Sequence, residues 1–116
     1  DGDNTNWSHR AAAAEHCHIL ITNPDTIHAS ILPNWKNCYR KLLANIQYIA
    51  FDEAHVYQGC FGAHVSYIVS RLLRLCSVAS CMTMTSDTSI ATTNTPIFIA
   101  SSATIDNPEG RFRLLC

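Results

Sequence analysis

The stretch "YIAFDEAHVYQG", residues 48–59, decides the fold. Four apolar residues lead directly into Asp52 and Glu53, and His55 follows two positions later. A run that is apolar at every position is typical of a strand covered on both faces, which occurs mainly in parallel sheets flanked by helices. The carboxylates therefore stand where open parallel sheets bind their ligands, beyond the carboxyl end of a strand. The stretch predicts an α/β fold with a polar site at the sheet edge.

Helix and strand signals alternate on both sides of this stretch. Short apolar runs predict strands over residues 18–22, 46–51 and 96–101. Helical spacing and helix-start signals predict helices over residues 8–15, 24–30, 35–44 and 63–75, and again from residue 107. Residues 77–95 hold ten Ser or Thr residues and one charge, so we expect a flexible surface insertion there. The order strand, helix, strand, helix, strand, helix implies right-handed parallel crossovers.

A polar cluster follows each of the three predicted strands. The clusters are the TNPD segment (residues 22–25), the DEAH segment (residues 52–55) and the SSAT segment (residues 101–104). Because the carboxyl ends of parallel strands meet at one edge of a sheet, we expect the three segments to lie along one rim. The TNPD segment also predicts a helix start, with Asn23 as the cap, Pro24 at the first position and Asp25 in the first turn.

The carboxylates of the DEAH segment suit magnesium and water chemistry. Asp52 stands just past a buried strand, so its carboxylate is a rigid oxygen ligand of the kind that suits Mg²⁺. The Mg²⁺ ion in turn bridges to phosphate oxygens. Its neighbour Glu53 points elsewhere and can orient or deprotonate an attacking water. We expect His55 to form a hydrogen bond toward Ser102 or Thr104 on the adjacent strand. These residues predict a magnesium-nucleotide site.

Composition limits the partners of the chain. The formal net charge of −1 gives no overall basic field, so binding to nucleic acid must be local. The six cysteines are irregularly spaced and form no C-x-x-C pair, which predicts reduced, mostly buried thiols. No apolar run in the sequence looks long enough to span a bilayer, and no membrane contact is expected.

The motifs, taken in this order, resemble those of superfamily-two helicases. "DEAH" is similar to their motif II (Walker B), "SAT" to motif III, and "ILITNPDTIH" to the "TNPDMLH" segment around motif Ib. "DEAHVYQGCFGAHV", "SSATIDNPEG" and the opening "DGDN" resemble the branch of the eukaryotic HRQ-type RecQ-like proteins and the bacterial YprA/MrfA type. The resemblance covers nearly the whole chain except residues 77–95. It implies an α/β fold, a partial RecA-like (P-loop NTPase) lobe whose parallel sheet has flanking helices.

The resemblance also implies roles around the nucleotide. Asp52 would hold Mg²⁺ and Glu53 would polarise the water that attacks ATP. His55, Ser102 and Thr104 would couple hydrolysis to movement of the nucleic-acid strand. The intact protein would be an ATP-dependent DNA helicase of three-prime-to-five-prime direction, acting in DNA repair.

The other rim residues would face DNA. By the resemblance, Thr22, Asn23 and Pro24 lie near the DNA backbone, where helix amides are open to phosphate. Gly2, in the "DGD" segment, would also face the DNA backbone. The partners would be single-stranded or forked DNA and a second helicase lobe, in the nucleus of a eukaryote or the cytoplasm otherwise.

Two features of the helicase pattern do not occur in this sequence. No G-x-x-x-x-G-K-[ST] phosphate loop is present, and no second lobe that supplies arginine fingers. The chain starts without Met, so we interpret it as the C-terminal part of the first lobe (residues 1–116, motifs Ib, II and III). Such a piece is not expected to hydrolyse ATP alone. Its strand 97–101 would be a bare apolar edge that recruits other chains.

Three other functions fit parts of the sequence. The first is a DEAH-type RNA helicase, which the second lobe and accessory domains would distinguish. The second is a degenerate helicase lobe that serves as a non-catalytic docking module. The third is a metal-dependent hydrolase built on Asp52, Glu53 and His55, for which further ligands are lacking.

Overall fold

The computed structural model describes residues 16–83, 95–103 and 107–115. The helix expected over residues 8–15 lies outside this part of the chain. The elements are α2 (Pro24–Thr26), η1 (Ile27–Ile31), η2 (Trp35–Tyr39), α3 (Arg40–Ala44), β1 (Tyr48–Phe51), η3 (Ala54–Val56), α4 (Gly59–Thr83), β2 (Ile97–Ala100) and α5 (Pro108–Leu115).

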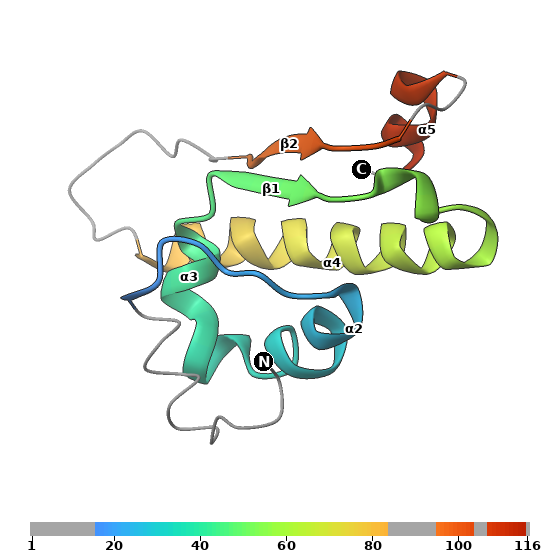
Figure 1. Cartoon of the computed structure of the whole chain (residues 1–116). Coiled ribbons are helices and arrows are strands. Elements are labelled where there is room, and N and C mark those ends of the chain that lie inside the picture. Colours follow the sequence, from blue (N-terminus) through green and yellow to red (C-terminus); the bar gives the residue numbers. More distant parts are fainter. Residues whose placement is uncertain (1–15, 84–94, 104–106, 116) are drawn as a thin grey trace.

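The sheet consists of β1 and β2, which run parallel and are linked through the long helix α4 (Figure 1). The register pairs Tyr48 with Ile97 and Phe51 with Ala100. Parallel strands need a long connection, which is usually a helix. Two parallel strands joined by a crossover helix are the unit that the apolar runs predicted. The α/β class expected from the sequence is confirmed.

Helix α4 is the centre of the molecule and is buried on two sides. One side carries Ile68 and Leu72, which pack with Ile31 and Leu43 from the helical segments before β1. The other side carries Val65 and Val69, which pack with Phe51 at the end of β1. Figure 1 shows the sheet on one side of α4 and the segments from α2 to α3 on the other. The apolar stripe predicted for this helix is confirmed.

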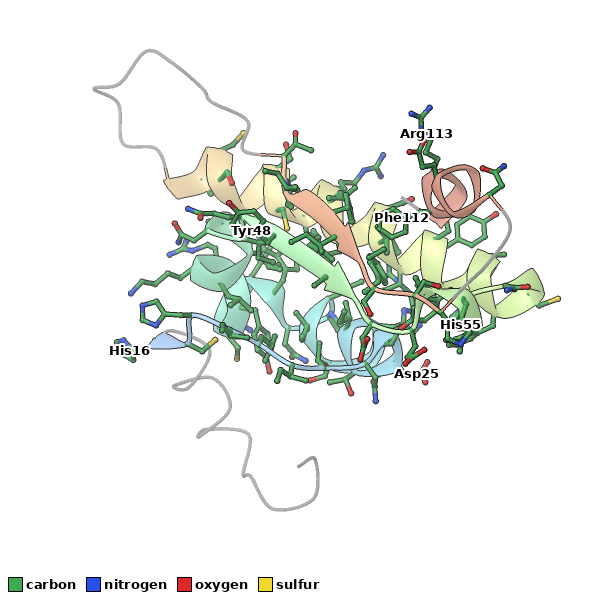
Figure 2. The ribbon with its side chains drawn as sticks, turned by 45° about the horizontal axis from the view of Figure 1, so that its top comes forward. His16, Asp25, Tyr48, His55, Phe112 and Arg113 are labelled. Carbon is green, nitrogen blue, oxygen red and sulfur yellow. The ribbon has the colours of Figure 1, made fainter. Side chains whose placement is uncertain are left out.

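An aromatic cluster fixes the carboxyl end of β1. The Phe51 ring lies 5.7 Å from Tyr57, 6.2 Å from Phe98 and 5.9 Å from Phe112, measured between ring centroids. Phe112 brings α5 against the sheet (Figure 2). Edge-to-face and offset contacts of this kind add to the burial of apolar area. The position of the residues that follow Phe51 is therefore anchored by this packing.

The helix start at the TNPD segment forms as predicted. The Asn23 side chain accepts a hydrogen bond from the Thr26 amide at 2.7 Å, and Pro24 occupies the first turn. The expected helix over residues 24–30 then continues as the π-helix η1 through Ile31. The helix predicted over residues 35–44 is present as η2 followed by α3.

The strand predicted over residues 18–22 is wrong. These residues have no regular secondary structure, and Ile19 and Ile21 are 81% and 93% exposed. An apolar run becomes a strand only when a neighbour pairs its backbone groups, and neither β1 nor β2 takes this role. The rim of the described sheet is therefore built by two strands instead of three.

The sheet is covered on one face only within the described residues. Ile49 and Phe98 turn toward α4, whereas Tyr48, Ile97 and Ile99 are 60%, 59% and 50% exposed. The expectation of burial on both faces does not hold for this part of the chain. The apolar edge expected along residues 97–101 is present in the described part of the chain, where β2 pairs with β1 and with no other strand.

The flexible insertion predicted over residues 77–95 is wrong for its first part. Helix α4 runs through Thr83, and Cys76 and Ala79 continue its buried stripe. Ser80 supports this turn, because its hydroxyl donates to the Ala44 carbonyl at 3.2 Å. Residues 84–94 lie outside the described part of the chain.

Helix α4 is also long and apolar enough to cross a membrane, by length and composition alone, over Gly59–Met82. The sequence-based expectation that no segment has this length is therefore wrong. Its two apolar sides pack on the sheet and on the segments before β1, as the central helix of a globular domain does. The helix accordingly belongs to the core.

The five described cysteines are all free thiols, as expected from their spacing. The prediction that most are buried is wrong, because only Cys76 is buried and Cys60 and Cys81 are exposed. Burial raises the pKa of the Cys76 thiol to about 11. Cys76 therefore stays protonated at neutral pH and acts as an apolar packing residue of α4.

Candidate functional site

The adjacent ends of β1 and β2 bring the DEAH segment and the start of the SSAT segment together. The ladder continues past the strands, since the Ser101 amide donates to the Phe51 carbonyl and the Ala54 amide donates to the Ser101 carbonyl, both at 2.8 Å. These bonds set the relative position of the two segments through backbone alone. Residues 49 positions apart in the sequence thus share one edge of the sheet.

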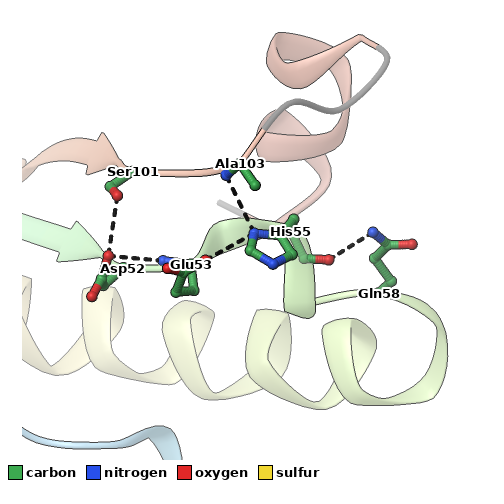
Figure 3. Close-up of polar contacts among 6 residues, drawn as sticks. All are labelled: Asp52, Glu53, His55, Gln58, Ser101 and Ala103. Atoms are coloured by element: carbon green, nitrogen blue, oxygen red, sulfur yellow. Dashed lines mark hydrogen bonds and ion pairs between the residues drawn. The ribbon is translucent and has the colours of Figure 1, made fainter.

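Asp52 is held at this edge through one of its two carboxylate oxygens. Oδ1 accepts hydrogen bonds from the Ser101 hydroxyl and from the Glu53 amide, each at 3.0 Å (Figure 3). Oδ2 has no protein partner among the described residues, and the side chain is exposed. The carboxylate is therefore oriented on one side and open on the other.

Glu53 adopts a backbone conformation that is uncommon outside glycine. Its φ of 52° and ψ of 45° place it in the left-handed region. The turn is held because the Val56 amide donates to the Glu53 carbonyl at 2.9 Å, at the start of η3. Such conformations cost free energy and are common at functional sites. The left-handed turn separates Glu53 from Asp52 and leaves its side chain 62% exposed.

His55 has two competing partners at one ring nitrogen. Nδ1 lies 3.4 Å from the Ala103 amide nitrogen and 3.2 Å from Oε2 of Glu53 (Figure 3). Nδ1 accepts from Ala103 only when it carries no proton, and it donates to Glu53 only when it carries one. The two bonds exclude each other, so His55 is bonded either to Glu53 or to the Ala103 amide beyond the end of β2, depending on which ring nitrogen carries the proton.

The donor set suits a hard cation that keeps most of its water. Asp52 offers one open carboxylate oxygen, and no group of three or more His, Cys, Asp or Glu side chains gathers within the described residues. A tetrahedral zinc site needs such a group. Mg²⁺ instead binds through one or two carboxylates, water and phosphate oxygens. The residues present fit magnesium bound together with a phosphate ligand.

The sequence predicted the meeting of these segments but not every contact in it. Asp52, Glu53 and His55 lie together, as expected. The expected partner of His55 was Ser102 or Thr104, but the structure places the Ala103 amide there, and Thr104 lies outside the described residues. Ser102 is exposed.

Two contributors were missed by the sequence reasoning, the Ser101 hydroxyl and the Ala103 amide. The signal that could have found Ser101 is its place as the first residue after the strand, directly across from Asp52.

The predicted nucleic-acid residues are not bonded to this edge in the described structure. Thr22, Asn23 and Pro24 precede and open α2, which lies toward the same end of the molecule as the DEAH segment (Figure 1 and Figure 2). Hydrogen bonds of Asn23 run within its own turn. Gly2 lies outside the described residues.

The chain belongs to the DEAD/DEAH box helicase family, whose sequence profile matches residues 1–110. It is 38% identical over 109 residues to the ATP-dependent helicase YprA of Bacillus subtilis (strain 168), a match that covers 94% of this chain and 13% of YprA. It is 46% identical over 76 residues to the ATP-dependent helicase HRQ1 of Saccharomyces cerevisiae (strain ATCC 204508 / S288c), covering 66% and 7%. The chain thus spans a small fraction of these relatives' length.

Solved structures of the DUF1998 helicase MrfA have the same fold. One superposes with a TM-score of 0.79 at 36% identity and covers 97% of this chain and 15% of MrfA. Another, of MrfA bound to DNA and AMPPNP, gives a TM-score of 0.76 at 37% identity and covers 97% and 14%. The resemblance to the HRQ and YprA/MrfA branch of helicases, and to a partial RecA-like lobe, is confirmed.

Proposed function

We propose that this chain is the part of a DNA helicase's first lobe that binds Mg²⁺ and takes part in the hydrolysis of ATP. The observation that carries the proposal is the hydrogen bond from Ser101 to Asp52, at 3.0 Å, because it joins the two motif segments at one sheet edge. Family membership supports the use of ATP. The intact protein's activity goes beyond this chain, which spans 13% of YprA.

In this proposal the open oxygen of Asp52 holds Mg²⁺, which would neutralise charge on the phosphates of ATP. Ser101 keeps the carboxylate in one orientation by bonding the opposite oxygen. A fixed ligand costs less ordering when the nucleotide arrives. Glu53, turned away by its left-handed backbone, orients the attacking water and takes its proton.

His55 is proposed to connect hydrolysis with movement of the nucleic acid. Its Nδ1 lies within reach of both Glu53 and the Ala103 amide, so a proton on this nitrogen exchanges one partner for the other. When His55 bonds Glu53, the segment after β2, which leads to Ser102 and Thr104, would be released. This gives the motif III residues a role in coupling.

The nucleic acid is proposed to be DNA. Structures of MrfA bound to DNA, at 37% identity to this chain, support that choice. Thr22, Asn23 and Pro24 would lie against the phosphate backbone, as would Gly2. Single-stranded or forked DNA, three-prime-to-five-prime movement and a second lobe are part of the proposal.

Two alternatives, an RNA helicase and a non-catalytic docking module, make different predictions. An RNA helicase would be stimulated by RNA, and a docking module would hydrolyse no ATP. A phosphate-loop lysine encoded before Asp1 would favour the enzyme over the docking module.

The test is ATP hydrolysis by the full-length protein, measured alone, with single-stranded DNA and with RNA of the same sequence and length. We expect stronger stimulation by DNA than by RNA. Stronger stimulation by RNA would replace the proposal with the RNA helicase. Hydrolysis that is absent under all three conditions would favour the docking module.

A further inference from the structure

A polar contact joins η1 to α4 on the side of α4 that faces away from the sheet. Nη1 of Arg71 lies 2.8 Å from Nδ1 of His28, 43 residues earlier in the chain. A guanidinium can only donate, so Nδ1 of His28 is the acceptor and carries no proton in this bond. The His28 ring also meets the His64 ring edge-on, with centroids 5.8 Å apart and planes at 75°. Two residues of α4 thus hold one histidine of η1.

These polar side chains border an apolar contact between the same two elements. Ile31 of η1 is buried in one cluster with Ile68 of α4. His64, Ile68 and Arg71 are spaced at helical intervals of four and three residues, so they form one stripe along α4. Apolar packing permits sliding, whereas a directional bond from Arg71 fixes one position of η1 on the stripe.

The two sides of this contact lead to different parts of the proposed machinery. His28 lies just over one turn after the helix start at Asn23. Asn23 accepts hydrogen bonds from the Thr26 and Ile27 amides, so the proposed DNA-binding residues and His28 belong to one helical segment. His64 lies in the second turn of α4, and that helix is tied to the DEAH segment. The Gln58 side chain donates to the His55 carbonyl at 2.6 Å, and the Gly62 amide donates to the Gln58 carbonyl at 3.1 Å.

Element η1 departs from the α-helical bonding pattern. It is π-helical over Ile27–Ile31, with the Leu32 amide donating to the Ile27 carbonyl at 2.9 Å. A π-turn holds one residue more than the bonding pattern of an α-turn and is frequent at functional sites. A change between the two would rotate His28 relative to Arg71. Coupling between sites needs an element with two discrete states, and an exchange of η1 between π-helical and α-helical bonding would supply one.

We propose that His28, His64 and Arg71 are positioning residues that transmit DNA binding at residues 22–24 to ATP hydrolysis at Asp52 and Glu53. This inference rests on the proposed function and adds the route between its two sites. The three side chains are exposed, so the contact contributes little to stability. Its effect is on the response of hydrolysis to DNA.

The first experiment compares two substitutions of His28 in the full-length protein. His28→Asn keeps an acceptor near the position of Nδ1, and His28→Leu removes it at similar size. We expect His28→Leu to lower the ratio of DNA-stimulated to DNA-free ATP hydrolysis by about fivefold or more, the lower end of couplings between sites. His28→Asn should restore most of it, with the KM for ATP unchanged in both.

A purely structural role of His28 gives the opposite order. Leu is the better helix former and Asn the worse, so a stability effect would harm His28→Asn more. That order, or equal ratios in the two variants and the wild type, would overturn the proposal. DNA-free hydrolysis and the thermal midpoint show whether each variant is folded.

The second experiment uses the two arginines of α4. Arg71→Met should lower the DNA stimulation as His28→Leu does, and the double variant should lose no more than either single one, because one bond is removed in all three. Arg74→Met is the matched control and should leave the ratio unchanged. Equal effects of Arg71→Met and Arg74→Met, or losses that multiply in the double variant, would contradict the route.

The two proposals fail in different ways. A wild-type protein that hydrolyses ATP without any response to DNA would overturn both. A DNA-stimulated wild type whose His28→Leu and Arg71→Met variants respond normally would overturn the route alone.

Discussion

Ser101 and Asp52 define the proposed metal site at the scale of single residues. The Ser101 hydroxyl holds Oδ1 of Asp52 at 3.0 Å, which leaves Oδ2 open at the sheet edge. A metal ligand that is held by a second side chain is already oriented before the metal arrives. In the proposed site, Ser101 would therefore act on metal affinity without touching the nucleotide.

The matching prediction concerns Ser101→Ala in the intact protein. We expect the Mg²⁺ concentration for half-maximal ATP hydrolysis to rise about fivefold, since an exposed hydrogen bond to a carboxylate contributes about 1 kcal/mol. Titration of Mg²⁺ at fixed ATP measures this shift. Ser70→Ala, on the surface of α4, is the control. An unchanged Mg²⁺ dependence in Ser101→Ala would remove Ser101 from the site.

The meeting of the DEAH and SSAT segments was predictable, because the carboxyl ends of parallel strands lie at the same edge of a sheet. The choice between Ser101 and Ser102 was not, because a shift of one residue at a strand end turns a side chain to the other face. The left-handed backbone of Glu53 was also not predictable, since nothing in the type of a glutamate indicates it.

At the scale of elements, α4 holds the site in place. The helix packs on Phe51 with one side and on the helical segments before β1 with the other. The sequence predicted its middle, residues 63–75, from the apolar stripe. Its extension to Thr83 was missed because Ser and Thr suggested a loop, although Cys76 and Ala79 continue the stripe at helical spacing.

Gly62 of α4 lies close to the backbone of Tyr57, which follows the DEAH segment. A Cβ at this position would lie 2.6 Å from the Tyr57 carbonyl oxygen, a backbone atom that cannot move alone. Gly→Ala inside a helix normally stabilises by about 1 kcal/mol. We expect Gly62→Ala to destabilise the lobe instead, by about 1–3 kcal/mol, as overpacking does.

Thermal or urea unfolding of the intact protein, followed at the transition of this lobe, measures the effect. Ala63→Ser, at an exposed neighbouring position, should change stability by less than about 0.5 kcal/mol. A Gly62→Ala variant that is as stable as the wild type, or more so, would show that α4 and Tyr57 are not in close contact.

The scale of the whole molecule is dominated by the open face of the sheet. Tyr48, Ile97 and Ile99 are at least half exposed there, and among the residues that the structure describes β2 is paired on one edge only. This edge was expected from the resemblance to helicases, because the sequence has no phosphate-loop strand to lie beside residues 97–101. The sequence could not show that residues 18–22 stay outside the sheet, because the composition of a strand does not specify its neighbour.

We predict that the 116-residue segment, expressed by itself, self-associates through this face and edge. Light scattering would show species larger than a monomer at micromolar concentration. Replacing Ile97 and Ile99 by Thr should shift the distribution toward monomer, because Thr keeps strand propensity and removes apolar area. A monodisperse monomer of the unchanged segment would contradict the prediction.

The most direct test of the site is Glu53→Gln in the intact protein, with ATP binding and ATP hydrolysis measured on the same preparation. Loss of the proposed base should lower the hydrolysis rate by about 100-fold or more while a fluorescent ATP analogue binds with unchanged affinity. Glu109→Gln, exposed on α5, should behave as wild type. Hydrolysis by Glu53→Gln at nearly the wild-type rate would contradict the assignment of the DEAH segment as the catalytic edge.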